Sequence, residues 1–219
     1  WQRRINASTV ETFDEATGYR LLSDWDIPTL RHESVDSAQA LSEALEGMSM
    51  PVVLKTAAPG ILHKSDVGGV FIGLMDRGAV EATYSDVASR LGPRALLVEM
   101  ASKGVELVVG GLVDPQFGPI VMIGAGGTLV EIVRDVSFVM APASLDEVER
   151  ALSGLKTAVL LDGVRGASAV DRKGLVETIA RFSQLVADLS DVVSSIEINP
   201  LLATTNGPFA LDVLVTPKS

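Results

Sequence analysis

The stretch Pro51–Met75, PVVLKTAAPGILHKSDVGGVFIGLM, predicts two strands joined by a polar, glycine-bearing loop. PVVLKTA is apolar and β-branched and ends at a Pro-Gly turn, and GVFIGLM repeats the strand pattern after the loop. The loop, Pro59–Gly69, holds one of the two histidines of the chain beside a lysine, an aspartate and paired glycines. Paired glycines let backbone N–H groups approach an anion closely. The loop is therefore a candidate anion site, although the same residues also fit a solvated turn.

Helix and strand patterns alternate in the first half of the chain. A capping-box pattern, Thr12–Glu15, precedes the first segment of helical spacing. Two further helices and an apolar strand complete a first α/β unit near Met100. The expected elements are helices over 15–25, 34–48 and 76–92 and a strand over 94–100.

The second half predicts a mostly antiparallel sheet followed by helices. Apolar segments broken by glycine or proline indicate strands within 104–114, 118–127 and 128–142. A capping box, Ser144–Glu147, opens one helix, and 172–190 is a long amphipathic helix. The chain closes with a predicted hairpin over 193–216 that turns at Asn206-Gly207.

Composition limits the function classes. The 219 residues are 47% hydrophobic, which is ample for a core, and 28 acidic against 18 basic residues give a net charge of -10. This charge disfavours nucleic acid and anionic lipid as partners. No cysteine and no bilayer-length apolar run occur, so a cytoplasmic protein is expected. The chain starts at Trp1 rather than methionine, which favours a domain cut from a longer protein.

The last hairpin carries polar residues in a pattern that suits a divalent cation. Strand alternation places Glu197 and Asn199 on one face, and Asp212 lies on the returning strand. A two-residue Asn206-Gly207 turn puts Leu201 opposite Asp212, which makes Asn199 and Asp212 diagonal neighbours about 7 to 8 Å apart. Mg2+ is usually held by one or two carboxylates together with waters and phosphates. The three side chains also fit an ordinary solvated hairpin face.

Other residues are candidates for a phosphate or nucleoside. Lys55 ends an apolar strand beside the loop and suits a phosphate as a point charge, although a lysine at a strand end is common. Glu99 and Glu106 flank the crossover between the two halves and can accept hydrogen bonds from adenine or ribose, or be merely exposed. His63 can serve as a base or a phosphate acceptor, or be solvated.

Taken in order, these segments resemble a known family. The segments that carry this resemblance are, in order, PVVLK, ILHKSDVGGV, VEM with GVELVVG, DPQFGPIVMIGAGGTLVEIVRDVSF, IEINPL and the late LDV. Through these segments the chain resembles the ATP-grasp domain of NDP-forming acyl-CoA synthetases. This domain is the nucleotide-binding β subunit of ADP-forming acetyl-CoA synthetase. The resemblance covers nearly the whole chain, and HKSDVGGV and DPQFGPIVM are specific to this branch. It departs at Val139, where family members often have arginine.

The resemblance implies a fold and a set of roles. The expected fold is an α/β (α+β) ATP-grasp fold of two α+β subdomains, 21–99 and 100–219, with the nucleotide in the cleft between them and a helix in 1–20 on the second subdomain. Lys55, Gly68 and Gly69 are expected at nucleotide phosphate, Glu99 and Met100 at adenine, and Glu106 at ribose. Glu197, Asn199 and Asp212 are expected to hold Mg2+, and His63 to be a phosphohistidine.

The implied activity is a component of an acid–CoA ligase. The whole reaction converts acid, CoA and ATP to acyl-CoA, ADP and phosphate, with phosphoryl transfer between His63 and ADP or ATP. A CoA-binding, catalytic α-type domain or subunit is the expected partner, which also binds the acid and CoA, so the chain alone is not expected to complete the reaction. The alternative is a regulatory ATP-grasp module of a protein lysine acetyltransferase fusion.

Overall fold

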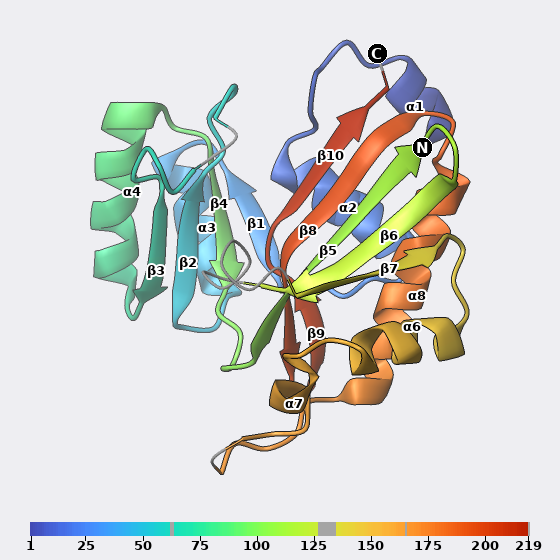
Figure 1. Ribbon diagram of the computed structural model, residues 1–219. Helices are drawn as coiled ribbons and strands as arrows, with labels where there is room; N and C mark the ends of the chain where they lie inside the picture. Colours follow the sequence, from blue (N-terminus) through green and yellow to red (C-terminus); the bar gives the residue numbers. More distant parts are fainter. Residues whose placement is uncertain (62–63, 127–134, 165, 219) are drawn as a thin grey trace. The chain divides into compact units, whose positions relative to one another are not determined.

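The computed structural model describes residues 1–61, 64–126, 135–164 and 166–218. Its contacts divide the chain into two compact units: unit 1 comprises Trp1–Thr29 and Ser102–Ser219, and unit 2 comprises Leu30–Ala101. Both are mixtures of helices and antiparallel sheet (Figure 1). Within the described ranges, no helix has the length and apolar character needed to cross a bilayer.

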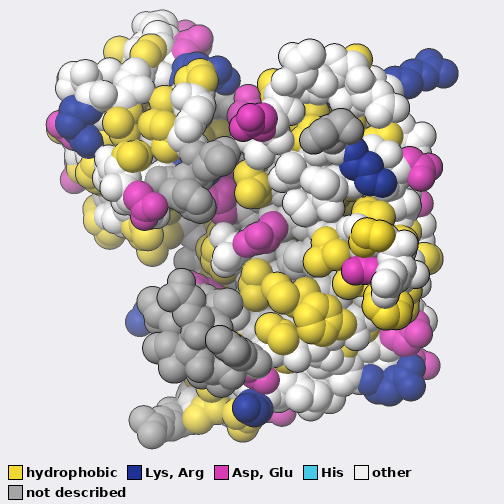
Figure 2. Space-filling model, turned by 45° about the horizontal axis from the view of Figure 1, so that its top comes forward, with side chains coloured by type: hydrophobic (Ala, Val, Ile, Leu, Met, Phe, Trp, Pro, Cys, Tyr) yellow, Lys and Arg dark blue, Asp and Glu magenta, His cyan; other side chains and the backbone are white. Residues whose placement is uncertain are grey.

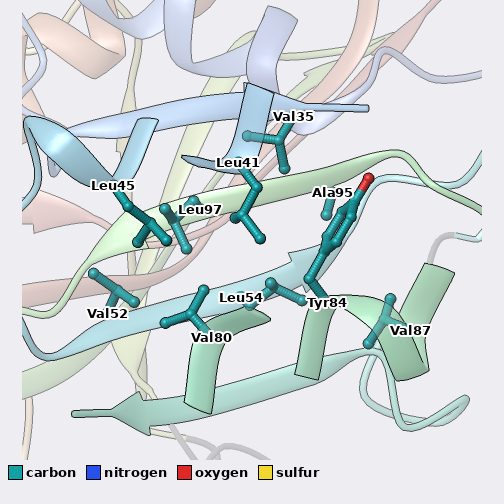
Figure 3. Packing of buried hydrophobic residues seen from close by; sticks show 10 residues of the cluster. All are labelled: Val35, Leu41, Leu45, Val52, Leu54, Val80, Tyr84, Val87, Ala95 and Leu97. Atoms are coloured by element: carbon teal, nitrogen blue, oxygen red, sulfur yellow. The ribbon is translucent and has the colours of Figure 1, made fainter. Parts of the chain in front are cut away.

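Unit 2 is a four-stranded antiparallel sheet in the order β1-β4-β2-β3 with two helices packed on one face. The core lies between the sheet and the helices and includes Leu41, Leu54, Val80 and Leu97 (Figure 3). The two loop-flanking strands predicted from the sequence are β2 and β3, and they are adjacent. The elements are β1 (His32–Val35), α3 (Ala38–Glu46), β2 (Val52–Thr56), β3 (Val70–Leu74), α4 (Arg77–Leu91) and β4 (Ala95–Glu99).

Side-chain caps fix where the helices of unit 2 begin. The Ser37 hydroxyl accepts from the N–H of Ala40, and the Asp76 carboxylate accepts from the N–H of Ala79. These bonds satisfy backbone donors that have no partner within the first turn of a helix.

Unit 1 is built on a six-stranded sheet in the order β10-β8-β5-β6-β7, with β9 paired to β8. All of these pairs are antiparallel, as the sequence predicts. The strands are β5 (Val105–Asp114), β6 (Gly118–Ala125), β7 (Val136–Met140), β8 (Val193–Thr204), β9 (Gly207–Ala210) and β10 (Val213–Pro217). The predicted strand over 128–142 lies partly outside the described residues.

Helices pack on one face of this sheet. A Cβ at Gly111 of β5 would come 2.2 Å from Val186 of α8, and a Cβ at Gly18 of α2 would come 2.5 Å from Val213 of β10. Glycine at these two positions therefore allows the close approach of helix and strand. The helices of unit 1 are α1 (Gln2–Asn6), α2 (Glu15–Asp24), α6 (Leu145–Ser153), α7 (Ala158–Leu161) and α8 (Arg172–Asp188).

The opposite face of the sheet carries exposed apolar side chains. Phe138 and Met140 of β7 are 57% and 52% exposed, and Leu112 of β5 is 39% exposed. Strand register places Phe138 in line with Glu197 of β8, because Met122 pairs with both Phe138 and Gly110, and Gly110 pairs with Glu197. Met140 and Leu112 align instead with Ser195, through Ile120. Figure 2 shows hydrophobic side chains gathered over this part of the surface.

Two sequence-based expectations differ from the structure and one capping expectation is confirmed. The cap of α2 is Asp14, which accepts from the N–H of Thr17, rather than a box begun by Thr12. The capping box at Ser144 is confirmed. The N-terminal segment of unit 1 extends to Thr29 rather than residue 20, because the Ala210 N–H donates to Pro28 O and Thr29 forms a bridge with Ala210.

Candidate functional site

The turn of the last hairpin sets the register of the candidate metal ligands. Thr204 pairs with Gly207, so the turn residues are Thr205 and Asn206 rather than the predicted Asn206 and Gly207. The Thr204 hydroxyl donates to Gly207 O and accepts from the Asn206 N–H, and Gly207 takes a positive φ of 119°. The predicted pairing of Leu201 with Asp212 is therefore wrong, and Leu201 pairs with Ala210.

This register places Asn199 directly opposite Asp212. Ile198 pairs with Val213, the Asn199 N–H donates to Asp212 O at 3.3 Å, and the Leu211 N–H donates to Pro200 O at 3.0 Å. Directly opposed residues have Cβ atoms about 4.5 to 5.5 Å apart, closer than the diagonal arrangement expected from the sequence. Asn199 and Asp212 are thus neighbours through their backbones, and Asp212 lies in the two-residue segment between β9 and β10.

Glu197 joins this pair through a side-chain hydrogen bond. The Asn199 Nδ2 donates to Glu197 Oε1 at 3.1 Å, which confirms that the two side chains lie on the same face of β8, and both residues are exposed. The neighbours of Glu197 on the adjacent strands are Gly110 and Leu214. A Cβ at Gly110 would lie 3.8 Å from the Met122 methyl group, so the Met122 side chain reaches over this position beside Glu197.

The donor set fits a hard divalent cation that keeps water or phosphate ligands. Within the described part of the chain, no three His, Asp or Glu side chains form a metal cage. Glu197, Asn199 and Asp212 offer two carboxylates and one amide, a half-cage of oxygen ligands of the type that Mg2+ uses with nucleotide phosphates.

Two buried polar residues of α2, which the sequence analysis missed, support the segment carrying Asp212. The Tyr19 hydroxyl lies 2.6 Å from both Leu211 O and Glu15 Oε1. Burial, followed by the carboxyls of Glu15 and Asp212, raises the pKa of Tyr19 far above its ordinary value, so the hydroxyl remains a donor. The available signal was a glutamate and a tyrosine four residues apart on the apolar side of a helix.

In unit 2, Lys55 is buried rather than exposed at the end of its strand. Its neighbours across the sheet are Val70 and Leu96, and only 8% of the residue is exposed. Val52 and Leu54 face the helices, so alternation turns Lys55 to the opposite face of the sheet.

The glycine pair lies at the same end of β2 as Lys55. The Thr56 N–H donates to Gly69 O at 2.7 Å, and a Cβ on Gly69 would come 2.5 Å from the Thr56 methyl group. The N–H groups of Gly68 and Gly69 donate to Ser65 O and Lys64 O. These two N–H groups are therefore used within the turn, which differs from the expectation that they face an anion.

Glu99 and Met100 lie at the other end of the strand pair. Glu99 is opposite Val52, and its Oε1 accepts from the Ser49 N–H at 2.9 Å. The Met100 N–H donates to Pro51 O at 3.1 Å, so a base at this position would meet the carbonyl and the half-exposed side chain of Met100.

Lys55 of β2 and Glu99 of β4 lie at different heights along this pair of strands. Lys55 pairs with Leu96, three residues before Glu99, which corresponds to a separation on the order of 10 Å along the strand. Glu99 pairs with Val52, so alternation turns its side chain to the helix face, away from Lys55, and this end offers a base the backbone at Glu99 and Met100.

Glu106 and His63 complete the predicted set. Glu106 is exposed on β5, opposite Leu202, and its carbonyl accepts from the Gly126 N–H at 2.8 Å. His63 lies outside the described residues.

A family model described as an ATP-grasp domain matches residues 4–216, and the chain belongs to this family. The sequence is 38% identical over 170 residues to the β subunit of ADP-forming acetate–CoA ligase I of Pyrococcus furiosus, covering 74% of this chain and 73% of that subunit. It is 34% identical over 201 residues to the ADP-forming 4-hydroxybutyrate–CoA ligase of Nitrosopumilus maritimus, covering 88% of this chain. The aligned region is only 29% of that ligase.

A solved structure shows the same fold with ligands. Dinucleotide-forming acetyl-coenzyme A synthetase 1 of Ca. Korarchaeum cryptofilum, in complex with coenzyme A and Mg-AMPPCP, gives a TM-score of 0.86 at 31% identity, covering 99% of this chain and 97% of that one. In that complex the phosphohistidine segment points towards the nucleotide binding site. The expectation of an α+β ATP-grasp fold is confirmed.

Proposed function

We propose that this chain is the nucleotide-binding component of an ADP-forming acid–CoA ligase. The whole reaction converts acid, CoA and ATP to acyl-CoA, ADP and phosphate, and a CoA-binding α-type domain or subunit completes it. The named relatives above are CoA ligases, either as a separate β subunit or as a longer chain. They do not favour the alternative of a regulatory module in a lysine acetyltransferase fusion.

The observation that carries the proposal is the direct opposition of Asn199 and Asp212, with Glu197 hydrogen-bonded to the amide. These residues would hold Mg2+, which supplies charge neutralisation for phosphate oxygens when it is bound.

The residues of unit 2 supply the nucleotide contacts in this proposal. Lys55 neutralises phosphate charge at one end of β2, where Gly68 and Gly69 let the loop backbone pass close to the phosphates. The backbone at Glu99 and Met100, about 10 Å away along the strands, contacts the base. Glu106, a residue of unit 1, accepts from the ribose hydroxyls in this proposal.

His63 carries the phosphoryl group in this proposal. During ATP formation the N–P bond to the imidazole breaks as an ADP β-phosphate oxygen forms the new O–P bond. The other ring nitrogen carries a proton, so when the electron pair of the broken bond returns to the ring, a neutral histidine leaves.

The test is phosphoryl exchange in the complete enzyme, that is, this chain together with its CoA-binding part. His63→Asn should reduce the exchange of phosphate between acyl phosphate and ADP at least 100-fold. His32→Asn is the matched control, since His32 is the other histidine of the chain and lies on β1. A normal exchange rate in His63→Asn would refute the role of His63.

A further inference from the structure

We propose that Glu15 and Tyr19 of α2 are positioning residues for Asp212, so that an N-terminal helix sets the metal affinity of a hairpin that it contacts across 192 positions of the chain. This inference rests on the proposed function, because it assumes that Asp212 binds the nucleotide-associated cation.

The contact that carries the inference is the bond from Tyr19 to the residue before Asp212. The Tyr19 hydroxyl is 2.6 Å from Leu211 O, and Tyr19 is only 1% exposed. The Leu211 carbonyl belongs to the peptide group that joins Leu211 to Asp212, so fixing its direction also fixes the start of the Asp212 backbone.

Glu15 holds the tyrosine in place. Its Oε1 lies 2.6 Å from the Tyr19 hydroxyl, and Glu15 is 7% exposed. Buried carboxyls are rare unless they are bound to partners, and this one lies one helical turn before Tyr19 on the same side of α2. The pair thus forms a buried polar link between α2 and the peptide before Asp212.

The strand segment around Asp212 is held from two sides. On the β8 side, Asn199 N–H donates to Asp212 O and Leu211 N–H donates to Pro200 O. On the N-terminal side, Ala210 N–H donates to Pro28 O and Phe13 N–H donates to Val215 O. The Tyr19 hydroxyl bonds to the Leu211 carbonyl, which lies in sequence between Ala210 and Val215. This carbonyl belongs to the peptide group directly before Asp212.

The Asp212 side chain also has a defined direction. Its Oδ1 accepts from the Val213 N–H at 2.9 Å, and Val213 packs against Gly18 of the same helix. Because metal ligands must be held to within about 0.5 Å of the productive geometry, a shift of this peptide should weaken the cation site without removing a ligand.

The experiment compares conservative variants of the full chain. Tyr19→Phe removes one hydroxyl, and Tyr84→Phe is the matched control, since the Tyr84 hydroxyl donates to Pro93 O in unit 2. Calorimetry of ADP binding at several Mg2+ concentrations gives the metal affinity, and electron paramagnetic resonance of bound Mn2+ gives a second value. Tyr19→Phe should lower the affinity for Mg2+ about tenfold and leave the affinity for ADP in the absence of metal unchanged.

Position 15 distinguishes positioning from bulk stability. The Tyr19 hydroxyl has one proton for two oxygen neighbours, so the amide N–H of Glu15→Gln can donate to Oη while the hydroxyl donates to Leu211 O. Glu15→Gln should keep most of the Mg2+ affinity. Glu15→Ala should lower the Mg2+ affinity by about the same factor as Tyr19→Phe. Hydrogen exchange at the Val213 N–H should be faster in Tyr19→Phe and normal in Tyr84→Phe, which reports the Asp212 side chain even without bound metal.

The outcomes separate the two proposals. One outcome would overturn the positioning role and leave the nucleotide function intact. In it, a folded Tyr19→Phe variant keeps its Mg2+ affinity and a normal rate of hydrogen exchange at the Val213 N–H, while Asp212→Ala loses its Mg2+ affinity. If the unmodified chain showed no Mg2+-dependent binding, the proposed function would fail and the inference would fail with it.

Discussion

Asn199 and Asp212 face each other across the hairpin of unit 1, joined by a hydrogen bond from the Asn199 N–H to Asp212 O at 3.3 Å. Their opposition depends on a turn at Thr205-Asn206, which Thr204 fixes through its hydroxyl. One local hydroxyl therefore sets the register that brings an amide and a carboxylate together.

Glu106 gives a prediction about the ribose. Glu106→Ala should weaken ATP binding about tenfold, which corresponds to roughly 1.4 kcal/mol, because it removes a charged acceptor for the ribose hydroxyls. The binding of 2′,3′-dideoxy-ATP should be weak already and should not change further. Equal losses for the two nucleotides, measured by calorimetry, would contradict a ribose contact.

Gly69 gives a prediction about the loop of unit 2. Gly69→Ala should destabilise the chain by about 1 to 3 kcal/mol, because its Cβ would meet the Thr56 methyl group at 2.5 Å and Lys64 O at 3.0 Å. Gly68→Asn is the control, since Gly68 has a φ of 61° with open space around it and asparagine tolerates that conformation. Urea unfolding of both variants measures their free energies of unfolding. Equal values for the two variants would argue against the described loop packing.

The contact between Gly18 and Val213 can be tested by compensation. Gly18→Ala should cost about 1 to 3 kcal/mol, because the new methyl group would lie 2.5 Å from Val213 Cγ1. In the double variant Gly18→Ala/Val213→Ala this clash is relieved, so the two losses should be less than additive by at least about 0.5 kcal/mol. Strict additivity in unfolding experiments would mean that helix and strand do not touch here.

Asp135 gives a pH dependence. Burial disfavours its charge, but hydrogen bonds from the Thr157 hydroxyl and from the N–H groups of Lys156 and Thr157 outweigh burial and lower the pKa of Asp135. A lowered pKa in the folded state adds stability that is complete above the unfolded value of about 3.9 and is lost as the pH falls below it.

The corresponding variant is Asp135→Asn. It should be less stable than the unmodified chain by roughly 1 to 3 kcal/mol at pH 7. The difference should stay constant down to about pH 5 and shrink below about pH 4. Urea unfolding between pH 7 and pH 3.5 measures it, and a difference that persists unchanged at the acidic end would show that the carboxylate charge is not the stabilising feature.

Much of the fold follows from short-range patterns. The strands on both sides of the loop, the antiparallel pairing of the second half and the Ser144 capping box were predictable, because alternation and capping chemistry act within a few residues. The face shared by Glu197 and Asn199 followed from the same alternation.

The features that escaped prediction depend on side chains or on distant contacts. The turn lies one residue earlier than predicted, and the Thr204 hydroxyl is hydrogen-bonded to Gly207 O and the Asn206 N–H within it. Asp14 replaced Thr12 as the cap because it reaches the Thr17 N–H. The bond from Tyr19 to Leu211 joins residues 192 positions apart, and no local pattern reports such a contact.

The measurement that tests the central claim most directly is calorimetric titration of the purified chain with ADP and ATP, with and without Mg2+, repeated on Asp212→Ala. We predict nucleotide binding that Mg2+ strengthens, and loss of that strengthening in Asp212→Ala with metal-free binding retained. Nucleotide binding by Asp212→Ala with an unchanged response to Mg2+ would contradict the assignment of the hairpin as the metal site.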